Sequence, residues 1–260
     1  EQDMVSMAGG LARHGLLPVV NSFASFLCAR GNEQIYNNTG EGSRIIYACH
    51  YAGLIPAGPG KSHQSIRDIS LLGALPRMLI VQPINGAETR MLLDYAIDRA
   101  NENVAIRLAI GPCPRSITLP ADYRLTPGRG VALAHGGDAT LFCYGPVMSH
   151  EALTAAELLA ARGIGLSVIN MPWLNRVDLD WLEQAVGDTR AVFVLDDHAP
   201  VGGLGDYVLN ALVARQLVRP FQKFAVEGEP ACGTPVEALR HHRLDGTSLA
   251  ARIEAALSQL

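Results

Sequence analysis

Cysteine, aromatic residues and charge are all scarce in this chain. Of its 260 residues, 6% are aromatic and 18% are charged. The cysteines are odd in number and never spaced as Cys-x-x-Cys: Cys28, Cys49, Cys113, Cys143 and Cys232. This pattern argues against both a disulfide framework and a zinc knuckle. We therefore expect buried free thiols, as in proteins of a reducing compartment such as the cytoplasm.

Long apolar runs and basic stripes are also missing. Apolar runs such as Ala191–Leu195 are far shorter than the roughly 20 residues that a membrane helix needs. The first dozen residues lack a basic start, so we expect no signal peptide. The net charge is −4 and the basic residues are scattered, which makes nucleic acid an improbable partner. We predict neither a membrane nor a nucleic-acid partner.

What the chain does contain is apolar residues, 48% of the total, in an alternating pattern. Strand-like runs alternate with amphipathic stretches, which predicts α/β domains with mostly parallel sheets. The predicted strands are 17–21, 44–49, 78–82, 104–108, 140–144, 165–170, 191–195 and 222–226. Predicted helices of the second half lie near 147–162, 178–186, 204–216 and 247–259, and a further helix is predicted at 65–75.

A proline-rich segment separates the two halves. Residues 111–128 hold four prolines and two glycines, which neither a helix nor a central strand tolerates. We therefore predict two consecutive doubly wound α/β domains, 1–111 and 129–260, with a linker at 112–128.

Two short motifs near the start carry candidate functional residues. The run Glu1-Gln2-Asp3-Met4-Val5-Ser6-Met7-Ala8 is helix-like, and a carboxylate at a helix start is favoured by the backbone dipole alone. Some twenty residues later, Phe23 and Phe26 are three apart, which would place both rings on one helix face. The helix-start carboxylate and the aromatic pair are therefore candidate functional residues.

A glycine-proline loop follows the second predicted strand. It begins near His50 and ends in Gly58-Pro59-Gly60-Lys61-Ser62-His63-Gln64. Histidines at the end of a strand in an α/β sheet lie where ligands bind. The same letters mimic the tail of a phosphate-binding P-loop, but Ile55 stands where that motif needs glycine and Pro59 removes a backbone donor.

The second half offers weaker signals. Asp197 and His198 follow a predicted strand, and we interpret them as a structural turn at the domain interface. Gly203-Leu204-Gly205 mimics a dinucleotide-binding motif, but Val208 occupies its third glycine position. The pair His241-His242 has no acidic or cysteine neighbour in the sequence, and we expect it at the surface.

Taken in order, the helix-start glutamate, the phenylalanine pair and the histidine loop resemble the transketolase family, over nearly the whole chain. The resemblance implies thiamine diphosphate as cofactor, with Glu1 activating it and Phe23 and Phe26 walling its aminopyrimidine ring. It also implies that His50 and His63 bind substrate and move protons. For such a role the carboxylate should sit in an apolar, aromatic pocket that raises its pKa toward neutrality.

The resemblance also implies that a separate subunit supplies the diphosphate-binding domain. Residues 1–111 correspond to the family's pyrimidine-binding domain, without the strand and helix that precede the glutamate there, and 129–260 to its C-terminal domain. The family's diphosphate-binding domain carries Gly-Asp-Gly and holds Mg²⁺, and no Gly-Asp-Gly occurs here. We therefore predict a β-like subunit of a split transketolase, in an α2β2 assembly with an N-terminal, diphosphate-binding subunit.

Two departures concern the substrate. The arginine with which the family binds a sugar phosphate corresponds to Ile110. The acidic residue that the family usually places before Gly-Pro-Thr-His-Gln has no counterpart in the histidine loop, which carries Lys61. A lone ammonium does not reproduce a planar guanidinium. We expect Lys61 to contact substrate, and expect a substrate other than an ordinary sugar phosphate, or one whose anionic group is held differently.

The chemistry expected is transfer of a two-carbon ketol or acyl unit from a ketose or 2-oxoacid donor to an aldehyde. Two alternatives stay open at this point. One is a decarboxylating enzyme of the same cofactor class, similar to deoxyxylulose-phosphate synthase or to a 2-oxoacid dehydrogenase β subunit. The other is a non-catalytic scaffold that keeps the fold.

Overall fold

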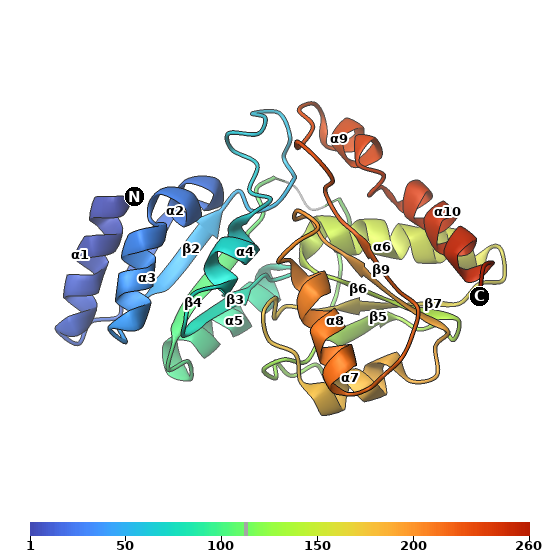
Figure 1. Ribbon diagram of the computed structural model, residues 1–260, viewed down its shortest axis with the longest axis horizontal. Coiled ribbons are helices and arrows are strands. Elements are labelled where there is room, and N and C mark those ends of the chain that lie inside the picture. The colour runs from blue at the N-terminus through green and yellow to red at the C-terminus, as the bar shows by residue number, and fades with distance from the viewer. Residues whose placement is uncertain (112–113) are drawn as a thin grey trace.

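The computed structural model describes residues 1–111 and 114–260. Its two α/β domains lie side by side, with the N-terminus at the far end of one and the C-terminus at the far end of the other (Figure 1). Both sheets are mostly parallel, so the predicted fold class is confirmed.

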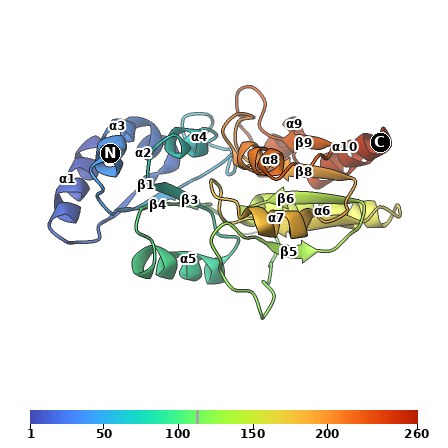
Figure 2. The same ribbon diagram turned by 60° about the horizontal axis from the view of Figure 1, so that its bottom comes forward.

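The first sheet is fully parallel, with strand order β1-β2-β4-β3. Its strands are β1 (Val19–Phe23), β2 (Ile46–His50), β3 (Met78–Val81) and β4 (Asn103–Leu108). All of β3 and most of β4 are buried, as expected for parallel strands covered on both faces. The helices are α1 (Gln2–Arg13), α2 (Ala24–Arg30), α3 (Asn32–Gly40), α4 (Asp68–Gly73) and α5 (Gly86–Asp98). Figure 2 shows α5 on one face of this sheet and α2 and α4 on the opposite face.

The second sheet has strand order β5-β7-β6-β8-β9, and only β5 runs antiparallel to its neighbour. Its strands are β5 (Val131–Ala134), β6 (Ala139–Cys143), β7 (Leu166–Asn170), β8 (Ala191–Leu195) and β9 (Phe221–Phe224). The helices are α6 (Gly145–Ala160), α7 (Leu179–Val186), α8 (Leu204–Ala214), α9 (Pro235–His241) and α10 (Gly246–Leu257).

Alternation along β8 divides the apolar core of the second domain. Val192 and Val194 pack with α7 and α8 in a cluster that also includes the core of the first domain. Phe193 and Leu195 pack in a second cluster with α6 and α10. Successive side chains of a strand point to opposite faces, so one strand serves both clusters. The cluster that contains Val192 and Val194 therefore runs through both domains.

The edge strand of the first sheet is covered by the second domain. Trp173 is fully buried and forms an antiparallel bridge with Val81. The flanking backbone bonds run from Gln82 N–H to the Pro172 carbonyl (2.9 Å) and from Leu174 N–H to the Ile80 carbonyl (2.9 Å). An edge strand otherwise leaves backbone N–H and C=O groups unpaired. This contact pairs backbone groups at the edge of β3 and holds the two domains together.

The strand predictions agree with the structure to within two residues at each end, as do the four helices predicted in the second half. The short strand β5 and helix α9 were missed, and the helix predicted at 65–75 is the shorter α4. The described residues 114–128 form no helix or strand. Pro112 and Cys113 lie outside the described residues, and the domain and linker boundaries stay a prediction.

Three of the predicted buried thiols are confirmed: Cys28, Cys49 and Cys143 are buried and free. The prediction was wrong for Cys232, which is exposed and free. It lies on a loop of the second domain, where sequence pattern gives little information on burial. Within 1–111 and 114–260, no helix is long and apolar enough to cross a membrane.

Candidate functional site

The candidate site lies at the carboxyl ends of β1 and β2. Phe23 ends β1, His50 ends β2, and their Cα atoms are register partners in the sheet. Tyr51 follows with a φ of 59°, in the left-handed region that non-glycine residues seldom occupy. This turn leads the chain into the loop 51–64. In open α/β sheets, this edge is where ligands bind.

The carboxylate of Glu1 lies beside this edge, immediately before α1. Ser22 Oγ, from β1, donates a hydrogen bond to Glu1 Oε1 (3.0 Å). Arg30 Nη1, from the end of α2, donates to Glu1 Oε2 (3.3 Å). The Ser22 hydroxyl, with a smaller contribution from Arg30, lowers the pKa of Glu1. The expectation of a raised pKa was therefore wrong for the chain by itself, because here the carboxylate meets two donors and solvent rather than an apolar pocket.

Four aromatic rings gather next to the carboxylate. The ring of Phe26 lies 5.7 Å from Phe23 and 5.1 Å from His63, between centroids. Tyr51 lies 5.5 Å from Phe23, edge to face. The Arg30 guanidinium carbon sits 4.1 Å above the Phe26 ring, so it joins the aromatic cluster to Glu1.

The pairing of Phe23 with Phe26 has a different origin from the one predicted. Phe23 is the last residue of β1 and the residue before α2, with extended backbone, so the two do not share a helix face. The turn from strand to helix brings the rings together instead. Their proximity, which the spacing was used to predict, is present.

The structure brings some of the predicted residues together and separates another. Glu1, Phe23, Phe26 and His63 form one group, in which His63 is held by a hydrogen bond between its Nδ1 and Ser62 Oγ (2.9 Å). His50 is half-buried beside Phe23. Lys61 does not join them, because its ammonium group extends toward Glu229 of the second domain, 3.6 Å away.

The donor set around Glu1 allows a direct test. Substituting Ser22 by alanine removes the hydrogen bond that contributes most to the lowered pKa, so we expect the pKa of Glu1 to rise. Arg30→Met should raise it less. A carbon-detected NMR titration of the Glu1 carboxylate measures both. A Ser22→Ala chain that titrates like the wild type would contradict this description.

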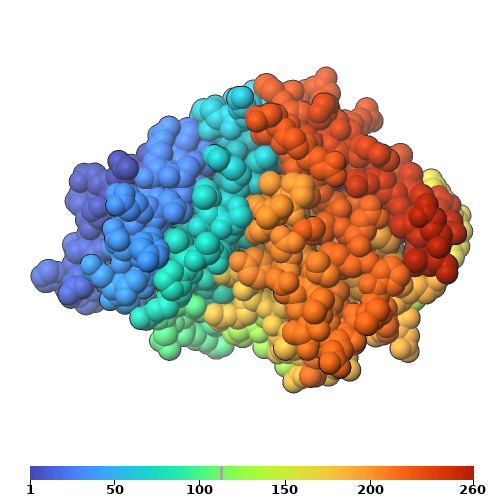
Figure 3. Space-filling view, viewed as in Figure 1, coloured from blue at the N-terminus to red at the C-terminus, as the bar shows by residue number. Residues whose placement is uncertain are grey.

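The loop 51–64 is fastened to both domains. Gln64 Nε2 donates to the carbonyl of Leu54 (3.0 Å) and to that of Ala231 in the second domain (2.9 Å). Cys232 Sγ donates to the Gly58 carbonyl (3.1 Å). Figure 3 shows the light-blue surface of this loop meeting the orange surface of the 228–234 loop at the upper edge. The second domain therefore holds the loop that carries His63.

The root of the loop permits no side chain at residue 53. Gly53 and Ser65 exchange two backbone hydrogen bonds, and a Cβ on Gly53 would stand 1.8 Å from Asp197 Oδ2. Gly53 also has a φ of +87°. We expect Gly53→Ala to destabilise the chain by at least about 2 kcal/mol in urea unfolding.

Gly10 in α1 provides the control for that substitution. A Cβ there meets nothing within 4 Å, and helix propensity favours alanine by up to about 1 kcal/mol. Gly10→Ala should therefore leave the stability unchanged or raise it. Equal effects of the two substitutions would contradict the crowding at residue 53.

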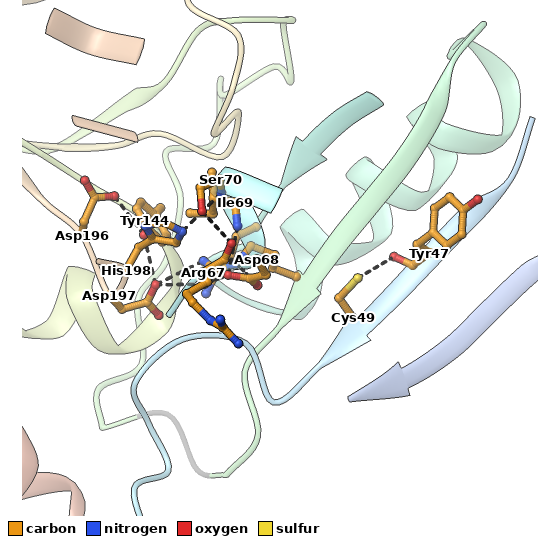
Figure 4. Close-up of polar contacts among 12 residues, drawn as sticks. Tyr47, Cys49, Arg67, Asp68, Ile69, Ser70, Tyr144, Asp196, Asp197 and His198 are labelled. Carbon is orange, nitrogen blue, oxygen red and sulfur yellow. Dashed lines mark hydrogen bonds and ion pairs between the residues drawn. The ribbon is translucent and has the colours of Figure 1, made fainter. Parts of the chain in front are cut away.

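A buried ion cluster lies beneath the loop, at the domain interface (Figure 4). Arg107 of β4 is fully buried, and its Nε and Nη2 donate to Asp68 (2.8 and 3.2 Å) at the start of α4. The same guanidinium donates to Asp197 Oδ1 of the second domain (3.1 Å). Burial opposes the charge, but Asp197 and Asp68 outweigh it and raise the pKa of Arg107. The cluster ties the domains together.

The turn at Asp197 and His198 has the structural role that was predicted. Ser70 N–H, in the first domain, donates to His198 Nε2 (3.3 Å), and Tyr144 OH donates to both Asp196 and Asp197 (3.0 Å each). The Ser70–His198 contact lies between the domains, and the Tyr144 contacts hold the turn within the second domain (Figure 4).

The two competing nucleotide motifs lack the geometry they need. Asp196 accepts hydrogen bonds from the N–H groups of Leu204 and Gly205, so its carboxylate already occupies the start of α8. In the other motif, the N–H groups of His63 and Gln64 both bond to the Gly60 carbonyl, and no helix begins until Asp68. The first segment therefore has its helix start occupied by a carboxylate, and the second lacks the helix start that a P-loop needs.

The remaining histidine pair is partly at the surface. His241 is exposed as predicted, whereas His242 is half-buried and its Nε2 accepts a hydrogen bond from Ala231 N–H (3.0 Å). In the described part of the chain, no three His, Cys, Asp or Glu side chains are grouped so that they could hold a metal ion.

Sequence reasoning missed Ser22, Arg30 and Tyr51. Ser22 stands between two named motif positions, and its side chain points toward Glu1 only because β1 lies beside the start of α1. The signal for Arg30 was its spacing of four from Phe26, which places both on one side of α2. Tyr51 adjoins His50 and was within reach of the same strand-end argument.

Known proteins resemble this chain in sequence and fold. Residues 1–110 match the family model of the transketolase pyrimidine-binding domain, and residues 128–249 that of the transketolase C-terminal domain. A solved structure described as a split gene transketolase, inactive beta4 tetramer, is 32% identical with a TM-score of 0.89, covering 99% of this chain and 82% of that chain. Transketolase from Campylobacter jejuni has the same fold at 17% identity, with a TM-score of 0.81 over 98% of this chain and 38% of that chain.

Curated relatives include two 1-deoxy-D-xylulose-5-phosphate synthases. That of Albidiferax ferrireducens is 30% identical over 97% of this chain, and that of a Polaromonas species is 32% identical over 98%. The chain spans 39% of the length of each. With both family models matched in order and a 32% identical relative matched over 99% of this chain, the chain belongs to the transketolase family.

Proposed function

We propose that this chain is the C-terminal subunit of a split, thiamine-diphosphate-dependent transketolase-like enzyme. Its partner would be an N-terminal subunit that holds the diphosphate and Mg²⁺, in an α2β2 assembly. The observation that carries the proposal is that Arg30 connects the Glu1 carboxylate to the ring of Phe26, which packs against the exposed Phe23 ring. The match to a split gene transketolase over 99% of this chain and 82% of that chain supports the division between subunits.

The described residues fit the pyrimidine half of the cofactor. A flat heteroaromatic ring needs an aromatic wall and a hydrogen-bonding group at its edge. Phe23 is 37% exposed and can supply the wall with Phe26, while the Glu1 side chain, 19% exposed, supplies the acceptor. Thiamine diphosphate, when bound, supplies a stabilised carbanion for two-carbon transfer.

Each residue of the site then has a defined task. Glu1 holds and releases a proton at its Oε atoms, and the partner subunit would displace water from it and raise its pKa from the lowered value of the chain alone. Phe23 and Phe26 orient the ring and exclude water. His63, fixed through Ser62, and His50, at the end of β2, would bind substrate hydroxyls and move protons.

The substrate would differ from an ordinary sugar phosphate in how its anion is held. Ile110, two residues after β4, is 38% exposed and offers no hydrogen bond from its side chain. A guanidinium at that place would provide a bidentate phosphate contact. We therefore propose transfer of a two-carbon ketol or acyl unit between a ketose or 2-oxoacid donor and an aldehyde acceptor, with standard sugar phosphates as poor substrates.

The test is reconstitution with the co-purified partner subunit, thiamine diphosphate and Mg²⁺. A panel of ketose and 2-oxoacid donors is paired with aldehyde acceptors, and two-carbon transfer is followed by chromatography. We expect transfer in the mixture and none by either subunit alone. Turnover of ordinary sugar phosphates at micromolar KM would refute the substrate assignment. Absence of transfer with every donor–acceptor pair would refute the proposed transferase activity.

A second candidate is a decarboxylating enzyme of the same cofactor class. It is favoured by the 1-deoxy-D-xylulose-5-phosphate synthases, which match nearly the whole chain at 30% and 32% identity. The same reconstituted mixture separates the two functions. Release of carbon dioxide from pyruvate with an aldehyde acceptor would establish this candidate, whereas transfer from a ketose without carbon dioxide would exclude it.

A further inference from the structure

A cavity of about 480 Å³ lies behind the aromatic cluster, between α2 and the second domain. Its first-domain wall includes one side of α2, with Ser25 and Ala29, and residues 61–62 and 64–68. Residues 228–230 of the second domain close it. Glu1, His50, His63 and the two phenylalanines do not line it, so it adjoins the site described above and shares with it only residues 61, 62 and 64 of the loop that carries His63. Its volume is in the range of small-molecule sites.

Two cationic side chains border this cavity. Lys61 faces Glu229 at 3.6 Å, but their side chains are 74% and 80% exposed, so this ion pair contributes little. Arg67 is exposed and makes no ion pair with any residue that the structure describes. Asp68 also lines the cavity, but its charge is taken up by Arg107. The mouth therefore favours an anion.

Polar groups without partners stand in the wall. Ser25 Oγ and Gln64 Oε1 are buried, and neither has a hydrogen-bond partner within 1–111 and 114–260. Gln64 is 4% exposed, and both of its amide hydrogens are committed to the carbonyls of Leu54 and Ala231, so its oxygen can only accept. Buried polar groups in proteins usually have partners, and a ligand hydroxyl is the kind of donor that these oxygens lack.

We propose that this cavity binds a small hydroxylated anion, such as a phosphate ester of a polyol. The anionic group would lie at the mouth between Lys61 and Arg67, and a hydroxyl would enter toward Ser25 and Gln64. Binding requires neither thiamine diphosphate nor the proposed transferase activity.

The site would communicate with the aromatic cluster through one residue pair. Ser62 lines the cavity and its hydroxyl bonds to Nδ1 of His63, whose ring packs on Phe26. A ligand that draws the Ser62 hydroxyl into the cavity releases His63. The bound anion therefore changes the environment of the His63 ring.

Calorimetry with glycerol 3-phosphate tests the proposal, with glycerol and inorganic phosphate as reference probes. We expect the full chain to bind glycerol 3-phosphate more tightly than inorganic phosphate, not to bind glycerol, and to bind more weakly at high salt. The double variant Lys61→Met/Arg67→Met should weaken binding at least about tenfold. Ala29→Phe, which fills the mouth and keeps both charges, should abolish binding.

Arg13→Met is the matched control, because Arg13 lies on α1 and pairs with Glu41, away from the cavity. It should bind like the wild type. NMR signals of His63 should shift on addition of glycerol 3-phosphate to the wild type and not to Ala29→Phe. No binding at millimolar concentrations, or unchanged binding by the Ala29→Phe chain, would overturn the site. Equal affinity for inorganic phosphate would overturn the hydroxyl contact.

Discussion

Replacing Glu1 by glutamine should lower two-carbon transfer by the reconstituted enzyme by about 10²–10⁴-fold, the range that a positioned acid–base group contributes. Glutamine keeps the size and polarity of the side chain but cannot take up a proton. The KM for substrate should change little, because in the proposed site Glu1 would contact the cofactor and not the substrate. Steady-state kinetics with the partner subunit at saturation measures both constants.

The control for this substitution is Asp3→Asn, which removes a carboxylate from the first turn of the same helix. It should alter turnover by less than about twofold, since only a helix-dipole contribution of a few tenths of a kcal/mol is lost. Cofactor affinity, measured by calorimetry on both variants, provides a readout independent of turnover. A Glu1→Gln enzyme as active as Asp3→Asn would refute the assignment of Glu1, and would favour a scaffold role for this chain.

Replacing Arg107 by methionine should produce the largest loss of stability. The substitution leaves the carboxylates of Asp68 and Asp197 buried without their cation. Breaking a buried ion pair in this way costs about 3–5 kcal/mol, which is a large part of the 5–15 kcal/mol that stabilises a typical domain. Urea unfolding monitored by circular dichroism measures the change.

Arg13→Met gives the comparison for an exposed ion pair. Arg13 and Glu41 have side chains 62% and 55% exposed, so the loss should stay below about 1 kcal/mol. Similar losses for the two variants would show that the interface cluster does not hold the domains together. If Arg107→Met unfolds in two steps where the wild type unfolds in one, the cluster also couples the domains.

Much of the fold could be predicted from the sequence because its signals are local. The strand at 191–195 is a continuous apolar run, as parallel strands buried on both faces require. The strand β5 was missed because its four residues, Val131–Ala134, are all only half-buried and carry no strong pattern. The lone capping signal of Thr234 before α9 was too short to predict a helix.

Residues of the candidate site could be predicted where they belong to ordered motifs. Contacts that depend on tertiary packing could not be predicted. Glu1, Phe23 and His63, which the resemblance to transketolases named as site residues, lie close together in the structure, and their roles stay a prediction. Ser22 and Arg30 meet Glu1 across the chain, through contacts that no local pattern encodes. For the same reason, the lowered pKa of Glu1 was not foreseen, because it depends on those two donors.

Lys61 shows the reverse case. Its place in the histidine loop suggested a substrate contact, yet the turn that bonds His63 N–H to the Gly60 carbonyl sends the lysine away from the aromatic cluster. Adjacent residues of a tight loop point in different directions. Sequence proximity to His63 therefore does not place the Lys61 side chain in the aromatic cluster, and its contact with substrate stays a prediction.

The most direct test of the shared site is calorimetry of thiamine diphosphate binding in the presence of Mg²⁺, on this chain alone and on its mixture with the partner subunit. We expect no measurable binding to the chain alone and tight, stoichiometric binding to the mixture, which Glu1→Gln weakens. Tight binding of thiamine diphosphate and Mg²⁺ to the chain alone would contradict the division between subunits. Absence of binding in the mixture would contradict the assignment of the aromatic cluster as a cofactor site.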